Sequence, residues 1–249
     1  MCSRQLNRAL TRLLCLWLAL AAGTVRAGVT AESTRVIFAS NLNEVAVLLA
    51  NVNPYPVMVQ TWIDDGALDS TPDKAISPFM SLPSVFRLEP GERRSLRIIF
   101  TGKQSLPRDR ESVFWLNLHE VPPSSVAAGM PAEQQRLVVS MHTQMKVFYR
   151  PTKLTMTQPE AAAKLTASWQ QNGEKTQLRI DNPSPYFMTL TAVELIAGQQ
   201  HQSLKGDMVK PESSLVLEAA GHLPGGPVQV EFTWLDDDGN PQKTRATLH

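Results

Sequence analysis

Cysteine is nearly absent from this chain of 249 residues, which contains only Cys2 and Cys15. Both lie near the N-terminus, so the rest of the chain has neither a disulfide nor a thiolate metal site. Long apolar runs are also missing. The longest, at residues 13–22, has roughly ten apolar residues, whereas a membrane-spanning helix needs about 20. These absences exclude a disulfide-rich scaffold and a chain with several membrane spans.

Motifs for catalysis and cofactor binding are absent too. The chain has no Gly-x-Ser-x-Gly elbow, no phosphate-binding glycine loop and no His-Glu-x-x-His pattern. The acidic run at 236–239 lacks the alternating spacing of a calcium loop. The five histidines share no metal-ligand spacing, and if His119 meets His142 across adjacent strands, a polar contact is favoured over a metal site. We therefore expect no enzyme, no metal and no cofactor.

The N-terminal segment has the three parts of a secretory signal. Arg4, Arg8 and Arg12 precede the apolar run, and the small residue Ala27 ends the segment. A short core helix is the alternative, but the absence of acidic residues and the small-residue exit argue against it. Cys15 lies inside the apolar run, which disfavours a lipoprotein anchor. We expect residues 1–27 to be removed and the product to be soluble and exported.

Charge is balanced in the remaining chain. Removal of the signal leaves 20 basic and 23 acidic residues, a net charge of −3. This balance gives no reason to expect nucleic acid as a partner.

What the chain does contain is a series of short runs rich in β-branched and aromatic residues, separated by prolines. This pattern is typical of all-β sandwiches. About 220 residues suffice for one domain or two. We predict strands of a first sandwich at 34–38, 44–51, 57–64, 93–100, 112–121 and 136–150. Pro151 ends the last of these, and strands of a second sandwich follow at 176–181, 187–195, 214–218, 228–235 and 243–248, with one or two helical turns at 159–165.

Two features refine this prediction. The segments 53–56 and 182–185 both place Asn-Pro and a second proline before an apolar strand, which favours two related domains over a chance match of common turn residues. Within 137–149, odd positions are apolar except Thr143, and four polar residues fall between them, Ser140, His142, Gln144 and Lys146. A strand of thirteen residues is well beyond the usual length of about five or six. Such a strand can lend an edge to another protein.

Several segments resemble the periplasmic pilus-assembly chaperones of the chaperone–usher pathway. The similar segments are 34–38, 107–112, 114–117, 146–151 and 182–187, the last of which is similar to the family pattern Asn-Pro-Thr-Pro-Tyr-Tyr. The resemblance implies two immunoglobulin-like domains, 28–151 and 152–249, in a boomerang arrangement with an inter-domain cleft. It also implies a periplasmic protein that binds pilus or fimbrial subunits, completes them by donor-strand complementation and delivers them to an outer-membrane usher.

The resemblance also assigns roles to particular residues. Arg35 and Lys146 would bind the C-terminal carboxylate of a subunit in the cleft. The alternative for each is an ordinary solvated surface cation. Leu137, Val139 and Met141 would enter the groove of a subunit that lacks its last strand. Alternatively, the odd residues of this strand pack into the chain's own core, which we expect for part of the strand.

A third set of residues would hold the two domains at a fixed angle. The matching positions are Glu111, Arg150 and one acid of 236–238, with Asp237 favoured. The alternative is a hairpin turn at Asp238-Gly239 with solvated acids.

The loop at 122–135 is short, which is similar to the short-loop subclass, and the lack of cysteine after residue 27 agrees. The exposed edge invites aggregation, and a self-capping homodimer would cover it. An exported immunoglobulin-like binding module or adhesin that donates no strand is the alternative function.

Overall fold

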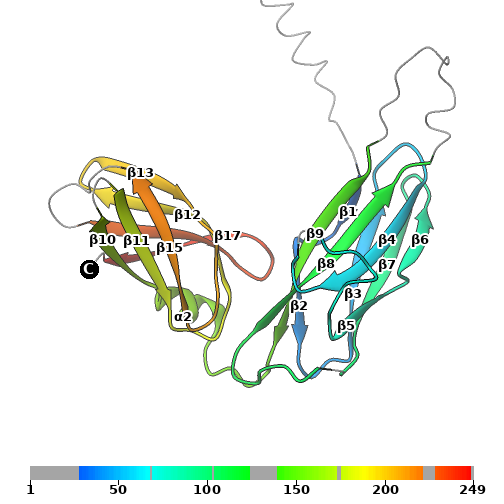
Figure 1. Ribbon diagram of the computed structural model, residues 1–249, viewed down its shortest axis with the longest axis horizontal. Helices are drawn as coiled ribbons and strands as arrows, with labels where there is room; N and C mark the ends of the chain where they lie inside the picture. The colour runs from blue at the N-terminus through cyan, green and yellow to red at the C-terminus, as the bar shows by residue number, and fades with distance from the viewer. Residues whose placement is uncertain are drawn as a thin grey trace, which may run out of the picture.

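The computed structural model describes residues 28–67, 69–102, 104–123, 139–172, 175–220 and 228–247. These residues form two immunoglobulin-like β-sandwiches, joined by a linker at residues 151–157. Figure 1 shows the two sandwiches diverging from the linker in a boomerang arrangement. The predicted signal peptide lies outside the described residues. Within the described ranges, no helix is both long enough and apolar enough to span a membrane.

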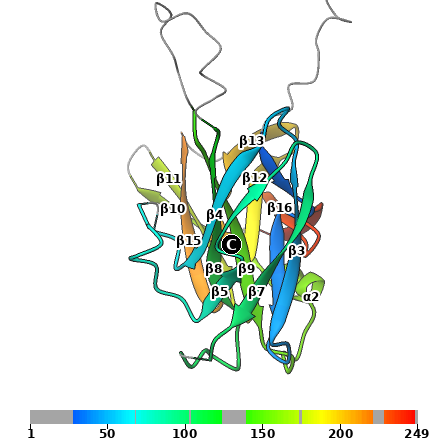
Figure 2. The same ribbon diagram turned by 90° about the vertical axis from the view of Figure 1, so that its right-hand side faces the viewer.

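The N-terminal domain packs a four-stranded sheet against a five-stranded sheet. The first sheet has the order β1 (Val29–Ala31), β3 (Glu44–Asn51), β7 (Arg93–Phe100), β5 (Phe79–Leu82). The second has the order β2 (Arg35–Ala39), β9 (Met141–Arg150), β8 (Ser112–Val121), β4 (Val57–Asp64), β6 (Val85–Leu88). Strands β2 and β9 are parallel, whereas β8 and β9 are antiparallel. Figure 2 looks onto this domain, with β3 and β7 to the right of β4 and β8.

The C-terminal domain begins with a short helix and also contains two sheets. Helix α2 (Gln158–Ala163) starts with a capping box between Thr157 and Glu160, which satisfies backbone donors at its first turn. One sheet has the order β10 (Thr166–Asn172), β11 (Lys175–Asn182), β15 (Ser213–Ala220). The other has the order β13 (Gln200–Lys205), β12 (Met188–Ala197), β16 (Gln229–Leu235), β17 (Pro241–Thr247), with β14 (Met208–Val209) also paired to β12.

Each domain has its own hydrophobic core. Alternate residues of the strands point inward in both sheets. Phe38, Leu116 and Val147 are fully buried in the first core, and Ile180 and Phe232 in the second. Two separate cores are what an independent pair of sandwiches requires.

Alternation located the central strands well and the edge strands poorly. The predicted strands at 44–51, 57–64, 93–100 and 112–121 have the observed bounds of β3, β4, β7 and β8. Strands β1, β5, β6, β10, β13 and β14 were not predicted. They are short or mostly polar, as in the sequence QHQSLK of β13, and a half-exposed edge strand lacks the clear apolar alternation of a central one.

The long strand predicted at 136–150 is shorter in the structure. Strand β9 begins at Met141, Val139 and Ser140 lie outside it, and residues 136–138 lie outside the described part of the chain. Its last rung with β8 pairs Met141 with Glu120. Since β8 ends one residue later, no described strand continues beside β9 beyond Met141. The predicted start was wrong because a ladder needs a neighbour, and alternation alone does not show where the neighbour ends.

The repeat between the domains is present but displaced by two residues. Asn51 donates to the carbonyl oxygen of Tyr55 and accepts from the backbone N–H of Asn53. Asn182 donates to the carbonyl oxygen of Tyr186 and accepts from the N–H of Ser184. The equivalent asparagines are therefore Asn51 and Asn182, and the predicted match of Asn53 with Asn182 was wrong. The shared bonds support a common turn in two related domains.

Candidate functional site

Two cations lie side by side where the domains meet. Arg35 in β2 is the register partner of Lys146 in β9, so the two side chains leave neighbouring parallel strands at the same level. Arg35 has an exposed fraction of 7%, and its Nη1 donates to the carbonyl oxygen of Leu235 in the other domain, at 3.3 Å. The buried Nε of Arg35 has no hydrogen-bond partner among the described residues. A buried donor without a partner is uncommon, so Arg35 has a hydrogen-bond donor that the described residues do not use.

The surroundings of both cations lower their pKa. Burial lowers the pKa of Arg35, while the nearby carboxylates of Asp237 and Asp236 act in the opposite direction. Burial also lowers the pKa of Lys146, and repulsion by Arg35 lowers it further, against the attraction of Asp207. A bound carboxylate would offset both effects because it would bring an opposite charge and hydrogen-bond acceptors to the two cations.

The three residues predicted to form a junction cluster are in contact. Arg150 Nε donates to Glu111 Oε1 at 2.6 Å. Arg150 Nη1 and Nη2 donate to the two carboxylate oxygens of Asp237, at 2.6 and 2.7 Å. Burial disfavours the charged Arg150, but the hydrogen bonds and charges of Asp237 and Glu111 outweigh it, so its pKa lies above the ordinary value. The guanidinium therefore bridges a buried acid of its own domain and a half-exposed acid of the other domain.

The three acids at 236–238 make different contacts. Asp236 Oδ1 accepts from the N–H groups of Asp238 and Asn240, which closes the turn between β16 and β17. Within the described residues, Asp237 is the one acid of the three that hydrogen-bonds to Arg150. Figure 1 shows this hairpin projecting toward the N-terminal domain. A hairpin turn and an inter-domain contact are therefore both present, on different residues of the run.

Gly239 in the same hairpin meets the N-terminal domain directly. Its φ is 84°, a conformation that other residues rarely adopt. A Cβ at this position would lie closer than van der Waals contact to the Oγ1 of Thr34, next to Arg35. The hairpin can approach Thr34 this closely because residue 239 has no side chain.

Further contacts at the junction were not predicted from the sequence. Glu111 Oε2 accepts from the N–H of Phe187 at 2.8 Å, and the Phe187 ring lies 5.9 Å from that of Phe148. Arg150 also lies over the ring of Tyr186, 5.0 Å from its centroid. The motif that contains Tyr186 and Phe187 indicated a turn, and nothing in its local pattern showed that the turn faces the other domain.

The apolar face of β9 changes character along its length. Met145 and Val147 are 4% and 0% exposed and belong to the core, whereas Val139 and Met141 are 59% and 44% exposed. All four are odd-numbered, so they share one face of the chain if it remains extended. Leu137, predicted to act with Val139 and Met141, lies outside the described residues, as does the predicted short loop from residue 124 onward.

The histidine pair noticed in the sequence does form. His119 and His142 are direct cross-strand partners, with ring centroids 6.1 Å apart. His142 Nε2 lies 2.8 Å from Asn117 Oδ1, a hydrogen bond that gives it a polar contact within the sheet. The described residues contain no cluster of three or more potential metal ligands.

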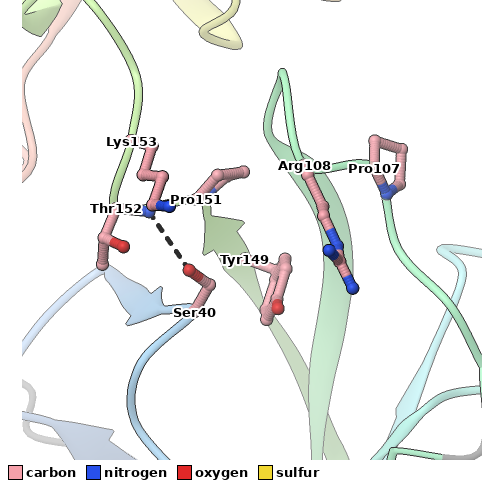
Figure 3. A pocket seen from close by; sticks show the side chains of 7 residues that line it. All are labelled: Ser40, Pro107, Arg108, Tyr149, Pro151, Thr152 and Lys153. Carbon is pink, nitrogen blue, oxygen red and sulfur yellow. Dashed lines mark hydrogen bonds between the residues drawn. The ribbon is translucent and has the colours of Figure 1, made fainter.

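A pocket of about 320 Å³ opens beside the end of β9 and the linker. Tyr149 and Pro151 line it together with Arg108 and Lys153, and the N–H of Thr152 donates to Ser40 Oγ at its edge (Figure 3). Tyr149 follows the odd-numbered face of β9, opposite to Lys146 and Arg150. The pocket is therefore separate from the paired cations, neither of which lines it.

Family comparison assigns both domains. Residues 28–155 match the family described as "Pili and flagellar-assembly chaperone, PapD N-terminal domain". Residues 160–246 match "Pili assembly chaperone PapD, C-terminal domain". Among curated proteins, the chain is 35% identical over 235 residues to the chaperone protein FimB/FhaD of Bordetella pertussis, covering 93% of this chain and 92% of the relative.

Solved structures agree with this assignment. The YadV chaperone superimposes with a TM-score of 0.74 at 30% identity, covering 89% of this chain and 100% of that one. The SafB chaperone of Salmonella enterica, solved in complex with the SafA pilin, has a TM-score of 0.68 at 27% identity, with 91% and 99% covered. With both domains matched in order, the chain belongs to the pilus-assembly chaperones of the chaperone–usher family.

Proposed function

We propose that this chaperone works in the periplasm, where it completes pilus subunits by donor-strand complementation and delivers them to an outer-membrane usher. In this proposal residues 1–27 are the signal peptide, and 28–151 and 152–249 are the two domains. Handover needs no cofactor, because one strand replaces another. The homologous SafB chaperone, solved with its pilin, supports subunits as the partner class.

The observation that carries the proposal is the pairing of two cations, Arg35 and Lys146, at one level of neighbouring strands where the domains meet. A subunit's C-terminal carboxylate would accept hydrogen bonds from both cations, and charge-assisted bonds are roughly twice as strong as neutral ones. Its position is then fixed relative to β9, because both cations sit on strands of one sheet. The carboxylate would thus set the register of the subunit chain along the chaperone.

The exposed residues Val139 and Met141 supply the second part of the proposal. Beyond Met141 no described strand pairs with the chain, so its backbone groups are available to the edge of a subunit sheet. Each apolar side chain that enters a subunit groove contributes roughly 1.5–3 kcal/mol. We propose that Leu137 continues this row, and that in free protein a second copy covers the same edge as a self-capping homodimer.

The test is subunit capture in the periplasm. Wild-type chaperone, Arg35→Ala and Lys146→Ala are each co-expressed with a cognate pilus subunit, purified through the chaperone and assayed for bound subunit. Lys153→Ala, which removes a linker cation outside the paired site, is the matched control. We expect both site variants to fold but lose bound subunit, and the control to retain it. Retention of subunit at wild-type level by both site variants would rule out the carboxylate anchor.

A further inference from the structure

A buried carboxylate that has no cationic partner among the described residues lies beside Gly28. Glu120 in β8 is 5% exposed, and no ion pair to it is found within the described ranges. Burying a carboxylate is costly unless it is hydrogen-bonded and paired. The surroundings of Glu120 therefore have the character of a site for a positively charged group.

Hydrogen bonds connect Glu120 to Gly28 and Val29, the first two described residues. Glu120 Oε2 accepts from the N–H of Val29, and Oε1 accepts from Asn53 Nδ2, each at 2.7 Å. Asn53 Oδ1 in turn accepts from the N–H of Gly28 at 3.0 Å. Gly28 has a φ of 95°, and a Cβ at this position would lie 3.4 Å from Glu120 Oε2. Asn53 thus binds the backbone nitrogen of Gly28, and the Glu120 carboxylate lies beside the same residue, so the two side chains form a pocket around Gly28.

We propose that this pocket binds the terminal ammonium group that appears when the chain is cut between Ala27 and Gly28. The inference rests on the signal peptide of the proposed function. Hydrolysis of that peptide bond consumes one water molecule and leaves a carboxylate on Ala27 and an ammonium group on Gly28. One N–H of the ammonium keeps the bond to Asn53, and its charge neutralises Glu120. The uncut chain has at this place only a neutral amide with a single N–H.

This pocket lies next to the residues proposed to be donated to a subunit, so cleavage before Gly28 can affect them. Glu120 is the register partner of Met141, the first residue of β9. A Cβ on Gly28 would lie 3.9 Å from Met141 Cε, and Figure 1 shows β1 beside the same end of β9. The ammonium group would therefore stabilise the rung at which the chain leaves the sheet. Cleavage would therefore stabilise the end of β9 from which the donated residues extend.

The neighbouring charged groups do not compete for Glu120 in the described structure. His119 and His142 lie on the opposite face of the sheet, because they alternate with Glu120 and Met141. Glu32, after β1, accepts from the N–H of Leu48. Beyond β3, Arg94 pairs with Glu92, and Arg93 is exposed.

A four-member comparison tests the inference. The protein that starts at Gly28 is prepared with a free and with an acetylated amino group, each with Glu120 and with Glu120→Gln, and unfolding is followed in urea at pH 7. Acetylation removes the terminal charge. We expect it to raise the unfolding equilibrium constant about tenfold with Glu120 present, as for a hydrogen bond to a charged group. With Glu120→Gln it should have little effect. An equal effect of acetylation in both backgrounds would overturn the inference.

A titration gives a second readout that does not need the Glu120→Gln variant to fold. The pKa of the Gly28 amino group, followed by NMR in the folded protein, should lie above the ordinary value of about 7.7–8.0. Its contribution to stability should then be complete below the ordinary value and disappear as the pH rises through the folded-state pKa. An amino group that titrates at or below the ordinary value would contradict the proposal. Neither readout involves subunit capture. Failure of this inference can therefore be distinguished from failure of the proposed function.

Discussion

Lys146 carries a charge in surroundings that disfavour it. Burial and then Arg35 lower its pKa, so the charged form destabilises the free protein at neutral pH. The sign follows from linkage: a lysine with a lowered folded-state pKa costs stability below that pKa, and the cost fades as the pH rises through it. The position is therefore better suited to a ligand than to the stability of the chaperone itself.

Lys146→Met should separate the two roles. We expect the free energy of unfolding at pH 7 to rise by on the order of 1 kcal/mol, because the methionine fills similar space without a partly buried charge. The gain should shrink as the pH rises toward the ordinary lysine pKa. Urea unfolding at pH 7 and pH 10 measures both effects. A loss of stability at pH 7 would show that the charge of Lys146 supports the free fold.

The same lowered pKa predicts how binding depends on pH. The carboxylate needs the protonated lysine, so affinity should fall as the pH rises through the pKa of free Lys146, which lies below the ordinary value. A peptide with the C-terminal sequence of a subunit, titrated by fluorescence anisotropy from pH 7 to 10.5, measures this fall. The amidated peptide is the control and should bind weakly throughout. Affinity that stays constant over this range would exclude Lys146 as the anchor.

At the level of a single strand, the odd-numbered face of β9 is buried at one end and exposed at the other. Its odd-numbered residues enter the core near the linker and become exposed where β8 ends. Val147 and Val139 look alike in the sequence, since both are apolar residues in one alternating run. The structure distinguishes them. Val147 lies in β9 and is covered by the opposite sheet, whereas Val139 precedes β9 and is exposed.

Two methionines of β9 provide a matched pair for testing this difference. Met141→Ala should change the free energy of unfolding by less than about 0.5 kcal/mol, as expected for an exposed position. Met145→Ala should cost about 2–5 kcal/mol, because it leaves a cavity in the core. Urea unfolding of both variants checks these values. For subunit capture the order should reverse, with Met141→Ala reducing bound subunit more than the stability loss explains. Full capture by Met141→Ala would argue against strand donation at that residue.

At the scale of the whole molecule, Arg150 connects the two arms. It holds Glu111 in its own domain and Asp237 in the other, and the guanidinium can bind Asp237 with two bonds at once. Such a pair specifies geometry more than it adds stability. We propose that it fixes the angle at which the subunit site is held open.

Asp237→Asn should loosen that angle without unfolding either domain. The chain after residue 27 has no cysteine, so spin labels at the exposed positions Ser95 and His201 report one distance between the domains. Electron-spin distance measurements should give a broader distribution for Asp237→Asn than for wild type. Asp238→Asn, on the neighbouring exposed acid, is the control and should match wild type. Equal distributions for all three would show that Arg150 does not set the angle.

The strands with strong alternation and the presence of two sandwiches could be predicted from the amino-acid sequence. Alternation is a local property, so β3, β4, β7 and β8 could be located without knowing their neighbours. Arg35, Lys146 and Arg150 were selected by resemblance, since nothing in their local pattern separates them from ordinary surface cations.

Which of these residues meet and which are buried depends on how the sheets and domains pack. It selected Asp237 from three successive acids, aligned Asn51 rather than Asn53 with Asn182, and ended the pairing of β9 at Met141. It also placed Glu120 beside Gly28, 92 residues away in the chain. Each of these outcomes depends on contacts between distant segments, and the energy of such contacts is set by the packing of two sheets and two domains rather than by the order of residues along one strand.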